Sequence, residues 1–430
     1  MNILFLSVTD QRNHPLAKYS DLHCTYDFNN WIDGFNSIGH NFLYYTFYEN
    51  FVEGGVDLIE NDIENIIQEN NINLIIIPNM YYEIGVAFLK KLSFFGTKSV
   101  VVFFDDSSRF ESTSRFYVGL CDYVVTHESK HALKLYEPYD CNVTFFPCFP
   151  STNHYEKILL LANKASHPMV GVSFVGAKIA DRADFISKLN LLNITVSVFG
   201  SGWPHGRISQ DEMLKIFRDS KISLNFTKSG SAASNMQLKA RAFEIILAGG
   251  FLLTEYDEEL CQYFDVGTEI DVFTTAEDCA EKVGFYLGNP DVRLNMQRLA
   301  SLKCKSSLNF ECAWSIFFNN IDNGNWVGLT HKDTGGTPVA AIKGFLNWSI
   351  GIIKGRVLIG EFKFAFDQII FSLRELKYLA SVYGVKIYFM LSAFVIKLPF
   401  VLFRCILSNI KILRFTQKGL KTLLGKVGLS

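Results

Sequence analysis

Residues 170–255 decide the fold of this chain, because they repeat one pattern three times. They contain GVSFVG (171–176), ITVSVFG (194–200), ISLNFT (222–227) and ARAFEIILAGGFLLTE (240–255). Each of the first three runs is short, apolar and rich in β-branched or aromatic residues, and each leads into a helical pattern. Such strands, alternating with helices, predict a parallel sheet that is covered by helices on both faces.

The same alternation runs through most of the chain and predicts an α/β protein with two tandem Rossmann-like, doubly wound domains. Two such units form a cleft between the carboxyl ends of their sheets, where open α/β folds bind ligands. The strands expected in the first unit are Ile3–Val8, Phe42–Phe47, Leu74–Pro78, Ser99–Phe104, Tyr123–Thr126 and Val143–Phe146. Those expected in the second unit are Gly171–Val175, Ile194–Phe199, Ile222–Phe226, Phe251–Thr254 and Glu269–Phe273.

Composition shifts place the domain boundaries. We assign residues 1–165 to the first domain, 166–322 to the second, 323–338 to a polar, glycine-rich linker and 339–430 to a helical tail. The start of the chain, MNILFLSVTD, is expected to be a strand and not a signal peptide. The nine cysteines show no Cys-x-x-Cys spacing, which favours a reducing, cytoplasmic setting and argues against a zinc site.

The tail differs from the rest of the chain in charge. From Ala340 onward fourteen Lys or Arg face three acidic residues, whereas the preceding residues hold 27 basic and 40 acidic groups. Basic residues recur on one helical face of the tail, opposite Phe, Leu and Ile, at Lys386, Lys397, Arg404, Lys411 and Lys418. This pattern predicts a helix that lies on an anionic membrane surface.

Three other roles of the tail are considered: spanning a membrane, packing against protein and binding nucleic acid. A membrane-spanning helix at 387–403 contains Lys397 and Pro399 and is shorter than the ~20 residues that a span requires. Packing of the tail on the protein itself or on a partner protein is the second alternative. The tail is too apolar for an arm that follows nucleic acid, so no nucleic-acid partner is expected.

One helix of the second unit carries charges among apolar residues. We predict it over Gln237–Ala248, where Gln237, Arg241 and Glu244 share a face. An N-terminus near Ser234 or Asn235 would offer unpaired N–H groups to a phosphate. The Glu244 carboxylate would then accept hydrogen bonds from ribose hydroxyls. Alternatively, Arg241 and Glu244 form only an i,i+3 ion pair, worth about 0.2–0.5 kcal/mol.

Further candidates follow the neighbouring strands. Gly176, Lys178 and Arg182 combine close backbone approach with two cations, which suits a diphosphate, although Arg182 could equally be a solvated residue of the first helical turn. Trp203 is either a stacking platform or a cover for the core. Asn225 is a polar residue near the end of a buried strand and needs a hydrogen-bond partner.

The ordered set FVGAKIADRADFI, VFGSGW, ISLNFT, ARAFEIILAGGFLLTE and GTEIDVF resembles the nucleotide-sugar-binding half of GT-B glycosyltransferases, closest to the CgeB-like branch of "glycosyl transferases group 1". The resemblance covers roughly residues 170–320. It implies a nucleotide-diphosphate-sugar donor, no obligatory metal or cofactor, and a glycosyl acceptor that is bound mainly by the first domain.

The resemblance also assigns roles to single residues. Glu244 resembles the second glutamate of the paired-glutamate motif, which holds the ribose, and Lys178 and Arg182 resemble the phosphate-binding cations. The first glutamate of the pair is replaced by Met236, and Asn235 or Gln237 is the expected substitute in donor binding. From its position, Arg241 would stabilise either Glu244 or the charge of the leaving group.

A catalytic base is expected at the carboxyl edge of the first sheet. Asp105 and Asp106 follow one predicted strand and His127 follows another, while Asp10 and His14 follow the first strand. Each of these residues could instead cap a helix or form a turn. Adjacent Asp105 and Asp106 do not form the spaced Asp-x-Asp of metal-dependent transferases, so no metal is expected.

These observations predict a glycosyltransferase, of hexosyltransferase type, that is peripherally bound to the cytoplasmic face of a membrane and modifies a lipid-linked or surface-glycan acceptor. A nucleotide-sugar epimerase or hydrolase on the same fold is an alternative. A catalytically degenerate membrane scaffold is another, because of Met236.

Overall fold

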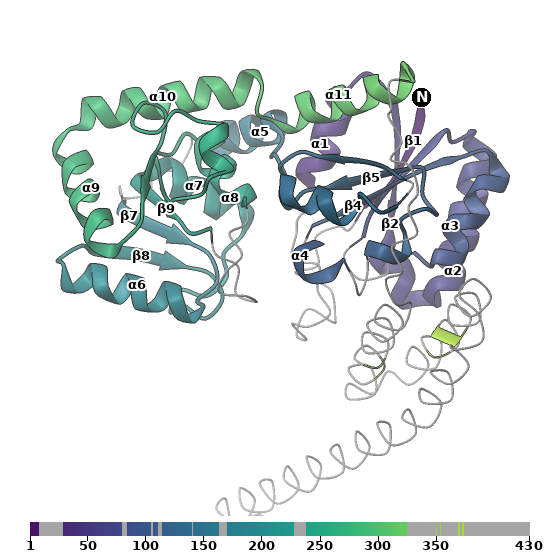
Figure 1. Ribbon diagram of the computed structural model, residues 1–430, viewed down its shortest axis with the longest axis horizontal. Coiled ribbons are helices and arrows are strands. Elements are labelled where there is room, and N and C mark those ends of the chain that lie inside the picture. Colours follow the sequence, from purple (N-terminus) through teal and green to yellow (C-terminus); the bar gives the residue numbers. More distant parts are fainter. Residues whose placement is uncertain are drawn as a thin grey trace, which may run out of the picture.

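A computed structural model shows two α/β domains that lie side by side (Figure 1). The structure describes residues 1–7, 29–79, 84–104, 106–110, 114–139, 141–162, 170–227 and 238–324, together with Ile350, Ile353, Ile369, Ser372 and Leu373.

The first domain is built on a six-stranded parallel sheet. Its order is β2-β1-β3-β4-β5-β6. The central strands are mostly apolar and are buried on both faces, as parallel sheets require. The strands are β1 (Asn2–Ser7), β2 (Asn41–Thr46), β3 (Leu74–Pro78), β4 (Lys98–Phe103), β5 (Tyr123–Thr126) and β6 (Asn142–Phe145).

The second domain is built on a five-stranded parallel sheet of order β11-β10-β9-β7-β8. Strand β7 therefore lies between β8 and β9, and the chain order reverses there. Open α/β folds bind ligands outside the carboxyl ends of the strands at such a switch point. The strands are β7 (Val170–Val175), β8 (Val196–Phe199), β9 (Ser220–Asn225), β10 (Leu252–Glu255) and β11 (Asp271–Phe273). Both predicted sheets are thus confirmed.

Helices cover both faces of each sheet (Figure 1). In the first domain they are α1 (Asn29–Ser37), α2 (Phe47–Asn70), α3 (Val86–Leu92) and α4 (Asp106–Arg109), with short 3-10 turns at η4 (Ser93–Phe95), η5 (Ser114–Phe116) and η6 (Lys130–Leu135). In the second domain they are α6 (Ala180–Leu191), α7 (Gln210–Asp219), α8 (Ala240–Leu247), η7 (Leu260–Gln262), α9 (Ala276–Gly288) and α10 (Pro290–Ser306).

Two helices connect the domains. Helix α5 (Thr152–Ala162) follows the first sheet, and its Tyr155 and Ile158 pack in a core cluster of the second domain. Helix α11 (Phe310–Asp322) follows the second domain but packs Phe310, Trp314 and Phe317 against the first sheet. The first domain therefore contains residues that precede the second domain in the sequence and residues that follow it. We had expected residues up to 322 to belong to the second domain.

The described tail residues pack on the first domain. Ile353 and Ser372 are fully buried, and Ile353 belongs to a core cluster that includes Leu4 of β1 and Ile59 of α2. Ile350, Ile369 and Leu373 pack against the same cluster. These tail residues therefore pack on the protein itself, which was the second alternative for the tail. The basic residues from Lys386 onward and most of the expected linker lie outside the described residues.

Within the described ranges, no helix is both long and apolar enough to cross a bilayer.

Candidate functional site

The loop after β7 packs tightly on the loop after β8. The Gly176 N–H donates to the Phe199 carbonyl at 2.8 Å, and the Trp203 indole N–H donates to the Gly176 carbonyl at 2.9 Å. A side chain at Gly200 would place its Cβ 2.3 Å from the Gly176 oxygen. These contacts explain Gly176 and Gly200 by the close packing of the two loops.

The two predicted phosphate-binding cations, Lys178 and Arg182, lie in or just after the loop that follows β7. The Lys178 ammonium lies 5.2 Å from the centre of the Trp203 ring, so Trp203 supports a cation and also braces Gly176. The Arg182 guanidinium lies 5.7 Å from the Phe174 ring centre, and its Nη1 donates to the Ala177 carbonyl at 3.2 Å. Both contacts hold long, flexible side chains near the switch point of the second sheet.

Arg182 and Arg241 come close enough to affect each other. Burial lowers the pKa of Arg182, and the positive charge of Arg241 lowers it further, whereas the carboxylate of Glu255 acts in the opposite direction. Two partly buried guanidinium groups repel each other unless negative charge lies between or beside them. Their proximity at the carboxyl edge of a parallel sheet is therefore typical of an anion site.

Helix α8 supplies the second arginine and a buried acid. Arg241 Nε lies 3.2 Å from Glu244 Oε2, and the Glu244 side chain is 10% exposed. The i,i+3 pair that we treated as the alternative is thus present. It does not exclude a ligand role, since the charge of Arg241 also acts on Arg182.

Helix α8 begins later than we predicted. It starts at Ala240, and its N-cap residue is Lys239, which makes no side-chain capping hydrogen bond. The extended backbone at Lys239, with φ −87° and ψ 136°, interrupts the helical pattern that the sequence continues back to Gln237. The prediction of a helix N-terminus near Ser234 or Asn235 is therefore wrong. Asn235, Met236 and Gln237 lie outside the described residues.

The strands next to β7 add groups that the sequence reasoning missed. Glu255, at the end of β10, accepts hydrogen bonds from the Thr227 N–H at 3.1 Å and the Thr227 hydroxyl at 3.2 Å. Asn225 finds its partner in Thr254, to whose hydroxyl it donates at 2.9 Å. Asn225 therefore ties two strands together. The signal for Glu255 was its place at the end of a buried, apolar strand, in FLLTE.

Among the base candidates, Asp106 lies in the core of the first domain. It is fully buried and accepts hydrogen bonds from the Tyr136 hydroxyl at 2.6 Å and from the Ser114 hydroxyl. Burial and the Asp106 charge raise the pKa of Tyr136 well above its ordinary value. This placement gives Asp106 a structural role, because both of its carboxylate oxygens are already used inside the fold. Asp105, Asp10 and His14 lie outside the described residues.

His127 directly follows β5 and is enclosed by aromatic rings. Its Nδ1 donates to the Phe146 carbonyl at 2.8 Å, while Nε2 is buried and has no hydrogen-bond partner among the described residues. The Trp31, Phe104 and Phe146 ring centres lie 5.0–5.6 Å from the His127 ring centre. Burial lowers the pKa of His127 to about 4. The ring is therefore neutral at pH 7, with the free lone pair on Nε2.

The buried histidine makes the stability of the protein pH-dependent. Between pH 6.5 and 4 the unfolded chain binds a proton at His127 and the folded chain does not, so stability falls as the pH is lowered through this window. The full loss is about 3 kcal/mol, from 1.36 kcal/mol per pKa unit. His127→Phe should flatten the pH dependence of urea unfolding between pH 7.5 and 4.5. Equal slopes for both proteins would contradict a neutral buried ring.

Among the described residues, no group of three or more His, Cys, Asp and Glu side chains is arranged to hold a metal ion.

Known proteins resemble this chain in part of its sequence and in its fold. Residues 182–311 match the family described as glycosyl transferase-like. A sequence search of curated proteins found no match.

Sucrose-phosphate synthase from Thermosynechococcus elongatus has a similar structure, with a TM-score of 0.50 and 9% identity over 76% of this chain and 99% of the other. A glycosyltransferase from Rickettsia africae gives a TM-score of 0.48 and 11% identity, covering 75% of this chain and 98% of the other. HepE from Anabaena, in complex with UDP and glucose, gives a TM-score of 0.47 and 10% identity, covering 76% of this chain and 100% of the other. The chain thus has the two-domain GT-B fold, and residues 182–311, which lie largely in its second domain, match the glycosyl transferase-like family.

Proposed function

We propose that this protein is a glycosyltransferase that moves a hexosyl group from a nucleoside-diphosphate sugar to a membrane-borne or surface-glycan acceptor. The donor binds at the carboxyl edge of the second sheet. The match of residues 182–311 to the glycosyl transferase-like family supports the reaction class. The CgeB-like branch remains a prediction from the sequence.

The observation that carries this proposal is that Arg182, which follows β7 at the switch point of the second sheet, and Arg241, at the start of α8, lie close enough for their charges to interact. Two guanidinium groups can bind several oxygens of a diphosphate at once. Lys178, held over Trp203 in the loop after β7, adds a third positive charge. Glu244 positions Arg241 and accepts hydrogen bonds from the ribose hydroxyls. Asn235 and Gln237 are proposed as donor-sugar contacts in place of the glutamate replaced by Met236.

In this reaction the bond between the anomeric carbon and the diphosphate oxygen breaks, and the acceptor hydroxyl oxygen bonds to that carbon. Negative charge grows on the departing diphosphate, where Arg182 and Arg241 stabilise it. The hydroxyl proton passes to a base on the first domain or to the departing phosphate itself. The base candidates that remain are Asp105, His127, Asp10 and His14. The three cations supply the positive charge that a metal would otherwise bring, so we propose a metal-independent enzyme with no cofactor.

We further propose that the basic residues from Lys386 onward attach the protein to an anionic membrane on its cytoplasmic face. Lys and Arg on one helical face and apolar residues on the other suit that surface, at about 1 kcal/mol for each basic residue near the lipid. Attachment would bring the first domain, on which the tail residue Ile353 packs, close to a lipid-linked acceptor.

A screen of nucleotide sugars tests the proposed function. A native-state ligand at 100 times its dissociation constant stabilises the protein by about 2.7 kcal/mol, so the true donor should raise the unfolding temperature clearly. The screen should compare UDP-, GDP-, ADP- and dTDP-sugars, with free sugars as the control.

Product analysis then separates the alternatives. A transferase needs an acceptor for net turnover, whereas a nucleotide-sugar epimerase or hydrolase converts the donor alone. A degenerate scaffold would bind no nucleotide sugar in the screen, and that result would reject the proposal.

A further inference from the structure

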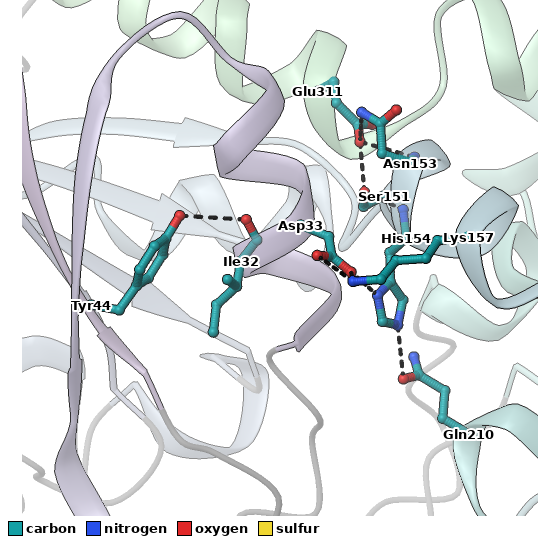
Figure 2. A network of polar contacts seen from close by, with 9 residues as sticks. All are labelled: Ile32, Asp33, Tyr44, Ser151, Asn153, His154, Lys157, Gln210 and Glu311. Carbon is teal, nitrogen blue, oxygen red and sulfur yellow. Dashed lines mark hydrogen bonds and ion pairs between the residues drawn. The ribbon is translucent and has the colours of Figure 1, made fainter.

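A polar network lies where the chain crosses between the domains (Figure 2). At its centre His154 of α5 is buried to 6% exposure. Its Nδ1 lies 2.6 Å from Asp33 Oδ2 on α1, and its Nε2 lies 3.2 Å from Gln210 Oε1 on α7. One imidazole therefore contacts a helix of the first domain and a helix of the second.

Asp33 is held firmly as the first-domain end of this network. Lys157 Nζ donates to both of its carboxylate oxygens, at 3.1 and 3.2 Å. Partial burial acts to raise the pKa of Asp33, but the hydrogen bonds from His154 and Lys157 outweigh it, and the pKa lies below its ordinary value. Asp33 therefore remains an acceptor for His154 at neutral pH.

The helix that carries His154 is also fixed in place. Glu311, in the first turn of α11, accepts hydrogen bonds from the Thr152 and Asn153 N–H groups at 3.1 and 3.3 Å and from the Ser151 hydroxyl at 2.6 Å. These groups lie at the start of α5, where backbone donors lack partners within the helix. His154 is thus presented from a helix whose N-terminus is held by the other connecting helix (Figure 2).

The second-domain end of the network leads to the donor site. Gln210, Met213 and Phe217 are spaced at i, i+3 and i+7 and share one face of α7. Met213 Sδ contacts Arg241 Nη1, and the Arg241 guanidinium lies 5.7 Å from the Phe217 ring centre. His154 thus contacts this face of α7 at Gln210, and the same face supports Arg241 through Met213 and Phe217.

We propose that His154 is a positioning residue that couples the orientation of the two domains to the placement of Arg241. Through Asp33 it follows α1 of the first domain, and through Gln210 it holds the face of α7 on which the Arg241 side chain rests. A movement of the first domain at this connection then shifts the guanidinium that binds the donor diphosphate. The proposal rests on the proposed function for the role of Arg241, but not for the coupling of α7 to α8.

Gln210→Leu is the sharpest test, because it breaks the link without removing a charge. Helix α7 keeps its own cap, in which Ser209 accepts from the Glu212 N–H and Glu212 accepts from the Ser209 N–H. The variant should weaken UDP binding about 3- to 30-fold, the range expected for coupling through a packed network. The same change in an Arg241→Met background should have no further effect, since the link acts through Arg241. GDP and ADP are measured in parallel.

Two further variants distinguish positioning from general structural damage. His154→Gln keeps a polar group at the Nε2 position and should retain most of the affinity for UDP. His154→Asn keeps a polar group only at the Nδ1 position and should weaken UDP binding as much as Gln210→Leu does. Lys157→Met is the matched control, because Lys157 contacts Asp33 but is 64% exposed and makes no described contact with α7. If Gln210→Leu weakened UDP binding equally in the Arg241→Met background and in wild type, the proposal would be overturned.

Hydrogen exchange of residues 238–250 gives a readout that needs no ligand. Gln210→Leu should speed exchange in this segment, which contains α8, and Lys157→Met should not. If the wild-type protein binds no nucleotide, the proposed function fails, but faster exchange in Gln210→Leu would still support the coupling. Unchanged exchange in Gln210→Leu would overturn the coupling whether or not nucleotide binds.

Discussion

Arg182→Met should lower the rate of sugar transfer about 100- to 1,000-fold, the loss seen when one preorganised donor to a developing negative charge is removed. The Arg182 side chain stacks on Phe174 and reaches the edge of the second sheet beside Arg241. Methionine keeps much of the apolar stem that lies on the ring but cannot donate a hydrogen bond or carry charge. Initial rates at saturating and at low donor concentration separate the effect on kcat from that on KM.

The Arg182 prediction requires that the fold is unchanged. Arg182 donates to the Ala177 carbonyl at the start of α6, a contact near the surface, so the unfolding temperature should fall only slightly. Lys188→Met on the same helix is a control, because Lys188 is exposed and lies in the last turn of α6. Arg182→Lys should recover part of the activity, since it restores charge but not the two-pronged geometry. Wild-type rates in Arg182→Met would show that the diphosphate binds elsewhere.

The fold was largely predictable because its strands are buried on both faces. A strand such as Leu74–Pro78 is apolar at nearly every position, and the prediction agrees with β3 to the residue. Helix α11 shows where this reasoning ends. Its apolar face has the ordinary helical period, but nothing in that period tells which of two sheets Phe310 and Trp314 will cover. Such long-range choices depend on the shapes of both surfaces.

The site was predictable where charges stand among apolar residues. Arg241 and Glu244 stand out for that reason. The structure pairs them at 3.2 Å, and the charge of Arg241 acts on Arg182. Sequence could not separate Asp106 from its neighbour Asp105, because the role of Asp106 depends on Tyr136, which reaches it from thirty residues away. The network around His154 was missed for a similar reason. Its partners Asp33 and Gln210 each look like surface residues of amphipathic helices until the domains are placed side by side.

Ile353→Asp should destabilise the first domain by more than about 4 kcal/mol, because it places a carboxylate with no partner in an apolar core. Ile353 is fully buried in the cluster that contains Leu4, Ile59 and Ile75, although it lies in the part of the chain that composition marks as a separate tail. Urea unfolding is measured by tryptophan fluorescence, since Trp31 and Trp314 lie in the core around the first sheet.

The control for Ile353→Asp is the same substitution at Ile316, which is 63% exposed on α11 and should cost less than about 1 kcal/mol. A loss at Ile353 no larger than at Ile316 would show that the tail is not part of the first domain.

The expected large loss has a consequence for the membrane proposal. A chain that ends near Gly336 would also lose Ile350, Ile353, Ile369 and Leu373, and would test the stability of the first domain instead of membrane attachment. Co-sedimentation with anionic vesicles should therefore compare the full chain with one that ends after Leu376, so that the buried residues stay and the basic face is removed.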